Sequence, residues 1–240
     1  LGAEIDQADK AGETALLKIA RSGRNPEVLA ELLQAGARTE KAAANGETPV
    51  IAAAQNPQPE MLRLLLDAGA DIRKTDNNGF GALYACALAN PNLEVHTELL
   101  RLGLNINEKG QDGMTPLMAA IVNPNPQVTR YYLIQGAELE AANRLGRTAL
   151  LIAASLSGDP MVIKILLAAG ADPLHRDLAG RNALDYAALN PARSILETFP
   201  ESLRPKPAAS SAPPAAPQPA RPPAPSPEAP KTPAAGPAPK

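Results

Sequence analysis

Few of the residues that usually hold a small fold together or perform chemistry occur in this chain of 240 residues. It has one cysteine, Cys86, two histidines and no tryptophan, and aromatic side chains make up only 2% of it. A single cysteine excludes an internal disulfide and a cysteine-rich zinc site. His96 and His175 have no cysteine or carboxylate cluster at ligand spacing, so neither indicates a metal site. The core must therefore come from small and aliphatic side chains, which favours packed helices over sheets.

Signals for a membrane, for secretion and for nucleic acid binding are also missing. No apolar stretch approaches the ~20 residues needed to cross a bilayer, and the N-terminus has no basic-then-apolar leader. The formal net charge of -2 gives no global reason to expect nucleic acid. We therefore expect no membrane span and no nucleic acid partner. The compartment stays open because the chain starts at Leu1 and not at a methionine. The cytoplasm is favoured, and a leader upstream of Leu1 would instead indicate a secreted or periplasmic protein.

What the chain does have is a repeat of 33 to 34 residues, marked by two series of glycines in phase. The first series opens stretches such as GETALL and GMTPLM, and its members are Gly12, Gly46, Gly79, Gly113, Gly146 and Gly180. The second series closes apolar runs such as LLDAGA, and its members are Gly36, Gly69, Gly103, Gly136 and Gly170. Together they predict successive copies of one structural unit, which we number units 1 to 6 by the first series.

Each unit predicts two helices and a polar turn. After the first glycine, a threonine such as Thr48 can cap a short alanine-rich helix, with Pro49 at its first position. A second helix begins near Gln58 and Pro59, and its apolar positions fall on one stripe. The second glycine ends that helix in a left-handed turn, and the following polar segment is rich in turn residues. We call these polar segments fingers, because they predict projecting, β-hairpin-like loops.

These features together resemble the ankyrin repeat, a unit of ~33 residues that combines a β-turn and two helices around a Thr-Pro-Leu-His-x-Ala signature. The resemblance covers residues 1 to 199, and its best matches are DGMTPLMAA over 112–120 and LLDAGADI over 65–72. It implies an all-α ankyrin-repeat solenoid of about six helix-turn-helix units with β-hairpin-like fingers. Leu1 to Asp6 match only the end of a unit, so we expect an array, residues 1–199, that is truncated at its N-terminus.

The chain departs from the family pattern at two places. The signature histidine is absent from all six units, and its place is taken by Leu17, Ile51, Tyr84, Met118, Leu151 and Asp185. We therefore expect the polar contact between units to become largely apolar, so that packing sets the register. Most units also carry an Asn-Pro pair before the second helix, at Asn56, Asn90, Asn123 and Asn190. These pairs predict rigid turns, and the alternative is a shared contact ridge along that edge of the array.

A proline-rich tail follows the array. From Pro200 onward, 15 of 41 residues are proline and most of the rest are Ala, Ser or Lys, so no apolar core can offset the entropy of folding. We expect residues 200–240 to be a disordered tail that serves as a linker. Spacings such as Pro222 to Pro225 leave a ligand for proline-reading domains as the alternative.

Nothing in the sequence indicates catalysis. The run Gly79-Phe80-Gly81 lacks the third glycine and the preceding buried strand of a phosphate-binding loop. Cys86 lies in an alanine-rich helix, where a small buried apolar role is more typical than a nucleophilic one. We therefore expect no enzyme activity and no cofactor.

The resemblance implies that a partner binds the concave surface formed by the finger tips and the first helices. We predict a monomeric, non-catalytic scaffold that binds an unidentified protein with an apolar centre and an acidic flank over units 3 to 6. Aromatic, Met and Arg side chains are the usual interface anchors, and the predicted binding residues are Phe80, Met114, Arg144, Leu145, Arg147, Arg176, Leu178 and Arg181. One alternative is that these side chains only pack between fingers. Another is that the array is the adaptor or targeting module of a longer multidomain protein.

Overall fold

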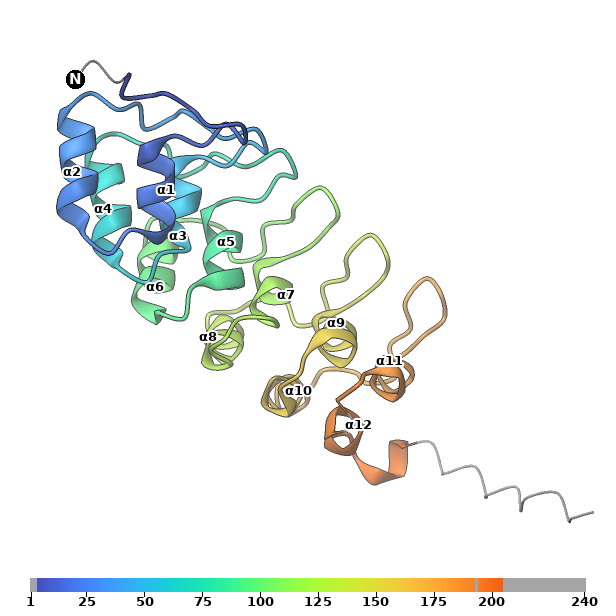
Figure 1. Cartoon of the computed structure of the whole chain (residues 1–240). Coiled ribbons are helices and arrows are strands. Elements are labelled where there is room, and N and C mark those ends of the chain that lie inside the picture. Colours follow the sequence, from blue (N-terminus) through green and yellow to red (C-terminus); the bar gives the residue numbers. More distant parts are fainter. Residues whose placement is uncertain (1–3, 193, 205–240) are drawn as a thin grey trace, which may run out of the picture. The chain divides into compact units, whose positions relative to one another are not determined.

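The computed structural model describes residues 4–192 and 194–204, and these residues form helices and loops without strands (Figure 1). Each unit contributes a first and a second helix, as the repeat predicts. The first helices are α1 (Ala15–Ser22), α3 (Pro49–Ala54), α5 (Ala82–Ala89), α7 (Pro116–Ala120), α9 (Ala149–Leu156) and α11 (Ala183–Leu189). The second helices are α2 (Pro26–Gln34), α4 (Pro59–Asp67), α6 (Leu93–Arg101), α8 (Gln127–Ile134), α10 (Pro160–Ala168) and α12 (Ser194–Thr198), followed by the short 3-10 helix η1 (Glu201–Leu203).

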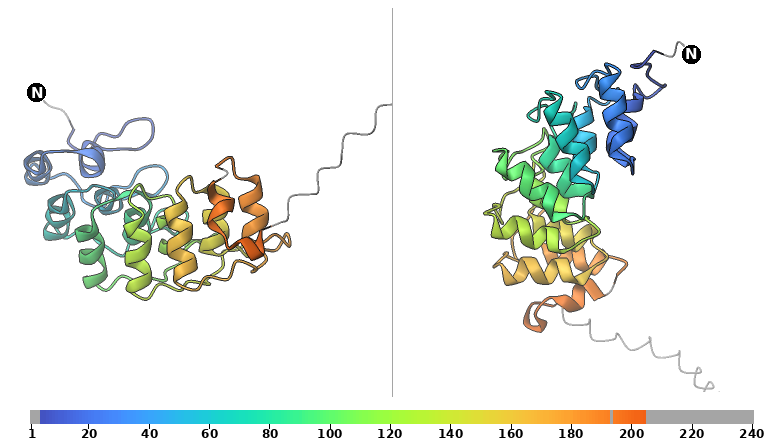
Figure 2. Two further views of the ribbon diagram at one scale, coloured as in Figure 1. Left: turned by 90° about the horizontal axis from the view of Figure 1, so that it is seen from below. Right: turned by 90° about the vertical axis from the view of Figure 1, so that its left-hand side faces the viewer.

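The helices stack in two rows that follow the order of the chain. Each first helix packs against the first helix of the next unit, from α1 against α3 to α9 against α11. Second helices do the same for α2 with α4, α4 with α6, α8 with α10 and α10 with α12, and the two helices of each unit pack on each other. Figure 2 shows this succession from two further sides. The predicted all-α solenoid of stacked repeats is confirmed.

Local sequence decides where the first helices begin. In three units the threonine after the recurring glycine accepts a hydrogen bond through Oγ1 from the amide three residues later, namely Thr14, Thr48 and Thr115. The same prediction is wrong for Thr148, whose side chain makes no cap bond. Such caps satisfy amides that have no partner inside the helix. Unit 3 has Gly81 at this position, so its first helix has no side-chain cap. A Cβ on residue 81 would lie only 3.3 Å from Glu108 Oε1, so the glycine leaves room for this side chain of the next finger.

Glycine is required where the second helices end and where the fingers turn. Gly36 follows α2 with φ of +89°, a left-handed conformation that only glycine adopts without strain. Gly46, at the turn of a finger, has φ of +84°, and a Cβ there would lie 2.6 Å from the Asn77 backbone nitrogen. The period of the two glycine series is therefore a requirement of the backbone.

The core lies between the two rows of helices and consists mainly of leucine, alanine, valine and isoleucine. All six residues of α3 are buried, and Leu16, Leu17 and Leu29 are fully buried in the first unit. Burial of each such leucine stabilises the fold by about 1.5–3 kcal/mol relative to its exposure to water. The aliphatic helical core expected from the scarcity of aromatic residues is what the structure contains.

The fingers are joined to one another by backbone hydrogen bonds and extend to the same side of the array (Figure 1). Each finger donates one amide to a carbonyl of the finger before it, at 2.8–3.0 Å, and the donors are Ala44, Asn77, Gln111, Arg144 and Leu178. These bonds fix the spacing of neighbouring finger ends.

The asparagines of the Asn-Pro pairs form a second series of bonds between units. Asn56, Asn90 and Asn123 are buried, and each Nδ2 donates to two backbone carbonyls of the preceding unit at 2.7–3.1 Å. Asn190 Nδ2 lies within hydrogen-bond distance of three carbonyls of unit 5, at 3.0–3.2 Å. Each Oδ1 accepts the amide two residues later, which is the predicted rigid turn. We call these four residues the asparagine ladder.

The ladder corrects a prediction about the register of the units. Four side chains at the position of the missing histidine are indeed buried apolar groups, namely Leu17, Ile51, Met118 and Leu151. The expectation that packing alone sets the register is wrong, because the ladder amides bind specific carbonyls of the neighbouring unit inside the core. The alternative of a contact ridge is excluded for the three buried asparagines, since a partner could not reach their side chains.

Packing within the described residues continues past the predicted end of the array at residue 199. Leu203 packs against the core, and Arg204 Nε donates to the Phe199 carbonyl at 2.8 Å. The predicted tail lies outside the described residues from residue 205 onward, as do residues 1–3. No helix in the described part of the chain is both long and apolar enough to cross a bilayer.

Candidate partner-binding surface

One side of the first helices is marked by the residues one, five and nine positions after each first-series glycine, and four of those at the five position are buried beneath the surface. We call this side the inner face. The first row is Glu13, Glu47, Phe80, Met114, Arg147 and Arg181. The second row is Leu17, Ile51, Tyr84, Met118, Leu151 and Asp185, and the third is Arg21, Gln55, Leu88, Val122, Ser155 and Leu189. The first row changes along the array from acidic to apolar to basic.

At units 1 and 2 the charges of the inner face pair with one another. Arg21 lies between Glu13 and Glu47, with each Nη to carboxylate distance at 2.6 Å. Gln55 Nε2 also donates to Glu47 at 2.7 Å. These bonds tie the first helices of the two units together and leave little unpaired charge at this end.

Between units 2 and 3 the inner face contains a groove of about 270 Å³. Unit 2 contributes Glu47 and Gln55 to its lining, and unit 3 contributes Phe80, Tyr84 and Leu88. The rings of Phe80 and Tyr84 stack, with centroids 3.9 Å apart and planes 15° apart, and Leu88 is 40% exposed. An apolar, aromatic lining with a few polar groups is typical of a binding site.

Contacts from the fingers hold the aromatic pair in place. The Phe80 ring lies against Gly110 of the next finger, where any Cβ would collide with it. Asp76 Oδ1 accepts the Phe80 N–H at 2.8 Å. Burial, together with the negative charges of Asp112 and Asp76, raises the pKa of Tyr84 to about 12. The Tyr84 hydroxyl therefore keeps its proton at neutral pH and can donate a hydrogen bond into the groove.

At units 5 and 6 the inner face is basic and is built around the buried carboxylate of Asp177. Tyr186 Oη donates to Asp177 Oδ2 at 2.5 Å, and Arg147 Nε lies 3.4 Å from the same oxygen. The guanidinium carbons of Arg147 and Arg181 lie 5.0 and 4.7 Å from the Tyr186 ring centroid, within cation–π range. Burial acts to raise the pKa of Asp177, but hydrogen bonds from Tyr186 and from the Arg181 and Ala179 amides outweigh it and lower that pKa to about 2. The carboxylate is therefore ionised at neutral pH.

Comparison with known families identifies the repeat. The family model described as ankyrin repeats (3 copies) matches residues 1–76, 58–143 and 82–177. The chain belongs to the ankyrin repeat family. Ankyrin repeats generally mediate protein–protein interaction, and their fold is typically non-catalytic.

Individual relatives agree with this assignment. The transient receptor potential cation channel subfamily A member 1 of Drosophila melanogaster is 36% identical over 80 residues, which are 33% of this chain and 7% of that protein. The chain thus spans a small part of the length of this curated relative. The crystal structure of the human ASB11 ankyrin repeat domain aligns with a TM-score of 0.69 at 23% identity, over 82% of this chain and 86% of that one. The latter similarity establishes the fold.

The structure of this ankyrin repeat array divides the eight predicted binding residues into two groups. Four are partly buried in the first row of the inner face, namely Phe80, Met114, Arg147 and Arg181. The other four are exposed near the finger ends, namely Arg144, Leu145, Arg176 and Leu178. Leu145 is 54% exposed and Leu178 is 81% exposed, which is unusual for leucine in a polar turn. The alternative of packing between fingers thus describes part of the first group, while the role of both groups in binding stays a prediction.

The prediction from sequence omits the unit 2 side of the groove. The unit 2 side is lined by Glu47, Ile51 and Gln55. Taken singly in the sequence, Glu47 resembles an acidic residue near a helix cap, Ile51 a core residue and Gln55 the end of a helix. Tyr84 stands out in the sequence only as a replacement for the signature histidine. All of these residues can be found from their position in the repeat, because each follows the recurring glycine of its unit by one, five or nine residues.

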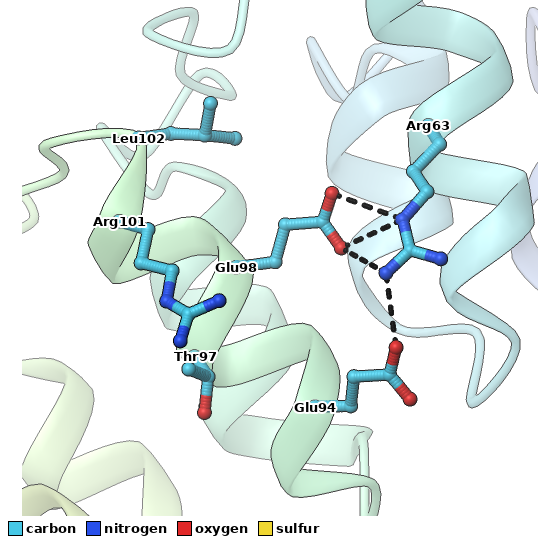
Figure 3. Close-up of a pocket in the computed structure, with 6 residues that line it drawn as sticks. All are labelled: Arg63, Glu94, Thr97, Glu98, Arg101 and Leu102. Carbon is cyan, nitrogen blue, oxygen red and sulfur yellow. Dashed lines mark hydrogen bonds and ion pairs between the residues drawn. The ribbon is translucent and has the colours of Figure 1, made fainter.

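A larger hollow, of about 500 Å³, lies on the second helices α4 and α6 (Figure 3). There Arg63 of α4 points toward Glu94 and Glu98 of α6, with Nη2 to carboxylate distances of 2.9 and 3.0 Å (Figure 3). Since these charges already pair across the junction of units 2 and 3, we assign them a structural role. The inner face, which offers an accessible aromatic pair and Leu88, is the stronger candidate for binding.

The groups with potential chemistry are buried. Burial raises the pKa of the Cys86 thiol well above its usual value, so the thiol stays protonated. His96 Nε2 lies 2.9 Å from the Asn90 carbonyl and Nδ1 lies 3.1 Å from Tyr132 Oη. Burial lowers the pKa of His96 and so favours the neutral ring, which can donate from Nε2 to the Asn90 carbonyl. Within residues 4–192 and 194–204, no group of three or more His, Cys, Asp or Glu side chains could hold a metal ion.

Proposed function

We propose that this chain is a protein-interaction module whose partner binds the inner face, centred on the groove between units 2 and 3. The observation that carries the proposal is the Phe80–Tyr84 pair with Leu88 beside it, because it offers apolar surface on a face whose acidic end is internally paired. The predicted site over units 3 to 6 is thereby extended to unit 2.

The groove is an anchor point and not the whole interface. A stable protein–protein interface covers about 800 Å² on each partner, which is more than one groove of this size provides. A partner anchored by an apolar side chain in the groove would also reach the exposed finger ends of units 5 and 6. Such an interface would follow the first row of the inner face from its apolar residues, Phe80 and Met114, to its basic residues, Arg147 and Arg181.

Photocrosslinking from single positions of the full chain tests the location of the site. A photoreactive residue in place of Leu88, which lines the groove, should crosslink a partner protein. The same residue in place of Arg101, which is exposed on α6, should not. Crosslinking of that protein from Arg101 but not from Leu88 would exclude the inner face.

A paired substitution tests the anchors. Phe80→Ala removes one ring of the aromatic pair, and Arg147→Glu reverses one charge at the basic end. We expect the double variant to lose the crosslinked protein in a pull-down while keeping its helical circular dichroism. Unchanged capture would show that the site assignment is wrong.

A second function, as the adaptor or targeting module of a longer protein, is favoured by one observation. The matched part of the Drosophila channel is only 7% of that protein, so an array of this kind can be a small part of a much larger chain. The full open reading frame that contains Leu1 and Lys240 would decide between the two.

A further inference from the structure

We propose that Arg147 and Arg181 form a clamp of two guanidinium groups that binds a carboxylate in an acidic segment of the protein partner. The inference rests on the proposed function and names the chemistry that the basic end of the inner face recognises. The two arginines occupy the same repeat position in consecutive units, and both contact Tyr186 and Asp177.

The clamp is held in position before any ligand binds. Arg147 Nε lies 3.4 Å and Arg181 Nε lies 4.0 Å from Asp177 Oδ2, and both guanidinium groups lie over the Tyr186 ring. Their side chains remain 28% and 43% exposed. Among the described residues, none accepts a hydrogen bond from the Nη nitrogens of either group. Arg181 Nε is itself buried without a hydrogen-bond partner, so a carboxylate can satisfy donors that no described group occupies.

The local charge selects an anion. Near the finger ends, Arg144, Arg147, Arg176 and Arg181 outnumber Asp112, Asp177 and Asp185, which leaves a local charge of +1. Asp177 is ionised and lies within about 4 Å of both clamp nitrogens, so it opposes a second negative charge at the same place. This arrangement favours a carboxylate over a phosphate dianion.

Two exposed leucines beside the clamp indicate what flanks the carboxylate. Leu145 and Leu178 lie at neighbouring finger ends that are joined by the hydrogen bond from the Leu178 amide to the Leu145 carbonyl, at 3.0 Å. Large apolar side chains this exposed are typical of interaction surfaces. The occupant that fits is therefore a protein segment in which acidic residues stand next to apolar ones.

Fluorescence anisotropy with the full chain tests this inference, and the probe is a labelled synthetic peptide in which glutamate and leucine alternate. Its control is the same peptide with glutamine in place of glutamate. We expect the glutamate peptide to bind about ten-fold more tightly or better, because charge-assisted hydrogen bonds are roughly twice as strong as neutral ones. The double variant Arg147→Gln, Arg181→Gln should reduce its affinity to that of the glutamine peptide. The matched variant Arg101→Gln, Arg130→Gln removes two exposed charges from α6 and α8 and should leave binding unchanged.

Nuclear magnetic resonance of the wild-type chain gives a readout that does not depend on the folding of a variant. The Nε–Hε signals of Arg147 and Arg181 should shift on titration with the glutamate peptide, and the variant Arg147→Lys, Arg181→Lys should bind with intermediate affinity because it keeps charge but loses the planar fork. Equal binding of the two peptides, unshifted signals, or a preference for an oligothymidylate of equal charge would overturn the clamp. Crosslinking from Leu88 involves neither arginine, so failure of the clamp and failure of the proposed function give different results.

Discussion

The junction between units 3 and 4 and the junction between units 4 and 5 use the same fold with different bonds. At the first, buried Asn123 donates to the carbonyls of Ala87 and Asn90 at 2.8 and 2.9 Å. At the second, the corresponding residue is Ser157, whose Oγ accepts the Asp159 amide and donates to the Asp159 carbonyl, both at 3.1 Å. The serine hydroxyl thus forms its hydrogen bonds within its own turn, whereas the asparagine amide donates to the neighbouring unit.

The space at the two junctions differs accordingly. Beside Ser157 there is a hollow of about 240 Å³, lined in part by Val122 and Leu156, which are 47% and 66% exposed. At the first junction Tyr132 Oη lies 3.1 Å from His96 and 3.2 Å from the Leu83 carbonyl, which adds polar bonds across the units. Apolar stacking of helices is thus common to all units, whereas the hydrogen bonds between units differ from one junction to the next. Because the stability of a repeat array is close to a sum of unit and junction contributions, each can be changed separately.

The largest effect should come from breaking the ladder with Asn123→Ala. This leaves the carbonyl of Ala87 without its donor inside the core, and we expect the free energy of unfolding to fall by about 2–4 kcal/mol. Urea unfolding of the full chain, followed by circular dichroism, measures it. Asn125→Ala is the matched control, because Asn125 donates to the Pro91 carbonyl at 3.0 Å in an exposed setting. Equal losses for the two variants would show that the ladder has no special role.

Acid should weaken the same junction through His96. Burial lowers its pKa below the usual 6.5, so the unfolded chain binds the proton more readily than the folded chain. The stability from neutral His96 is therefore present above about pH 6.5 and is lost as the pH falls below it, with a slope of up to about 1.4 kcal/mol per pH unit. Urea unfolding at neutral and mildly acidic pH measures the loss. In His96→Gln that part of the pH dependence should disappear, and its persistence would assign the effect to other groups.

A complementary double variant adds an asparagine of the ladder type to the junction between units 4 and 5, where Ser157 stands in its place. The double variant Ser157→Asn, Gly158→Pro recreates the Asn-Pro pair, and the space around Gly158 admits a side chain because nothing lies within 4 Å of a Cβ there. We expect a gain of about 1 kcal/mol in the free energy of unfolding and slower hydrogen exchange in α9 and α10. Gly158→Pro alone separates the effect of chain stiffening. No gain beyond that of the proline would mean that the new amide fails to reach unit 4.

The smallest effect should follow from removing an exposed bond between units. Arg63→Gln breaks the ion pairs of α4 with Glu94 and Glu98, which lie in water on the second helices. Surface ion pairs contribute little, so the urea midpoint should move less than in any variant above, and high salt should abolish the difference. A shift as large as that of Asn123→Ala would contradict the distinction between buried and exposed bonds.

Much of the fold could be predicted because its signals are local in the chain. Thr48 caps α3, Pro49 opens it and Gly36 closes the helix before it, and each acts within a few residues of itself. Of the candidate site, Phe80 and Arg147 could be named because apolar and basic residues are unusual beside a turn glycine. The groove itself could not, since it needs Gln55 and Leu88 from different units on one face. The same is true of Gly110, whose small size matters only because the Phe80 ring lies on it.

The sequence by itself determined the period, the helices and the turns, because glycine conformation, helix caps and apolar stripes act over short stretches of chain. Only the tertiary structure decided that Asn123 joins two units and not merely two helices, and that Arg147, Arg181 and Asp177 meet at one tyrosine. The physical reason is distance along the chain. Asn123 is about one repeat away in sequence from the carbonyls that it binds, and so is Arg147 from Asp177. A side chain's local pattern does not show which carbonyl or carboxylate the stacking of units will bring to it.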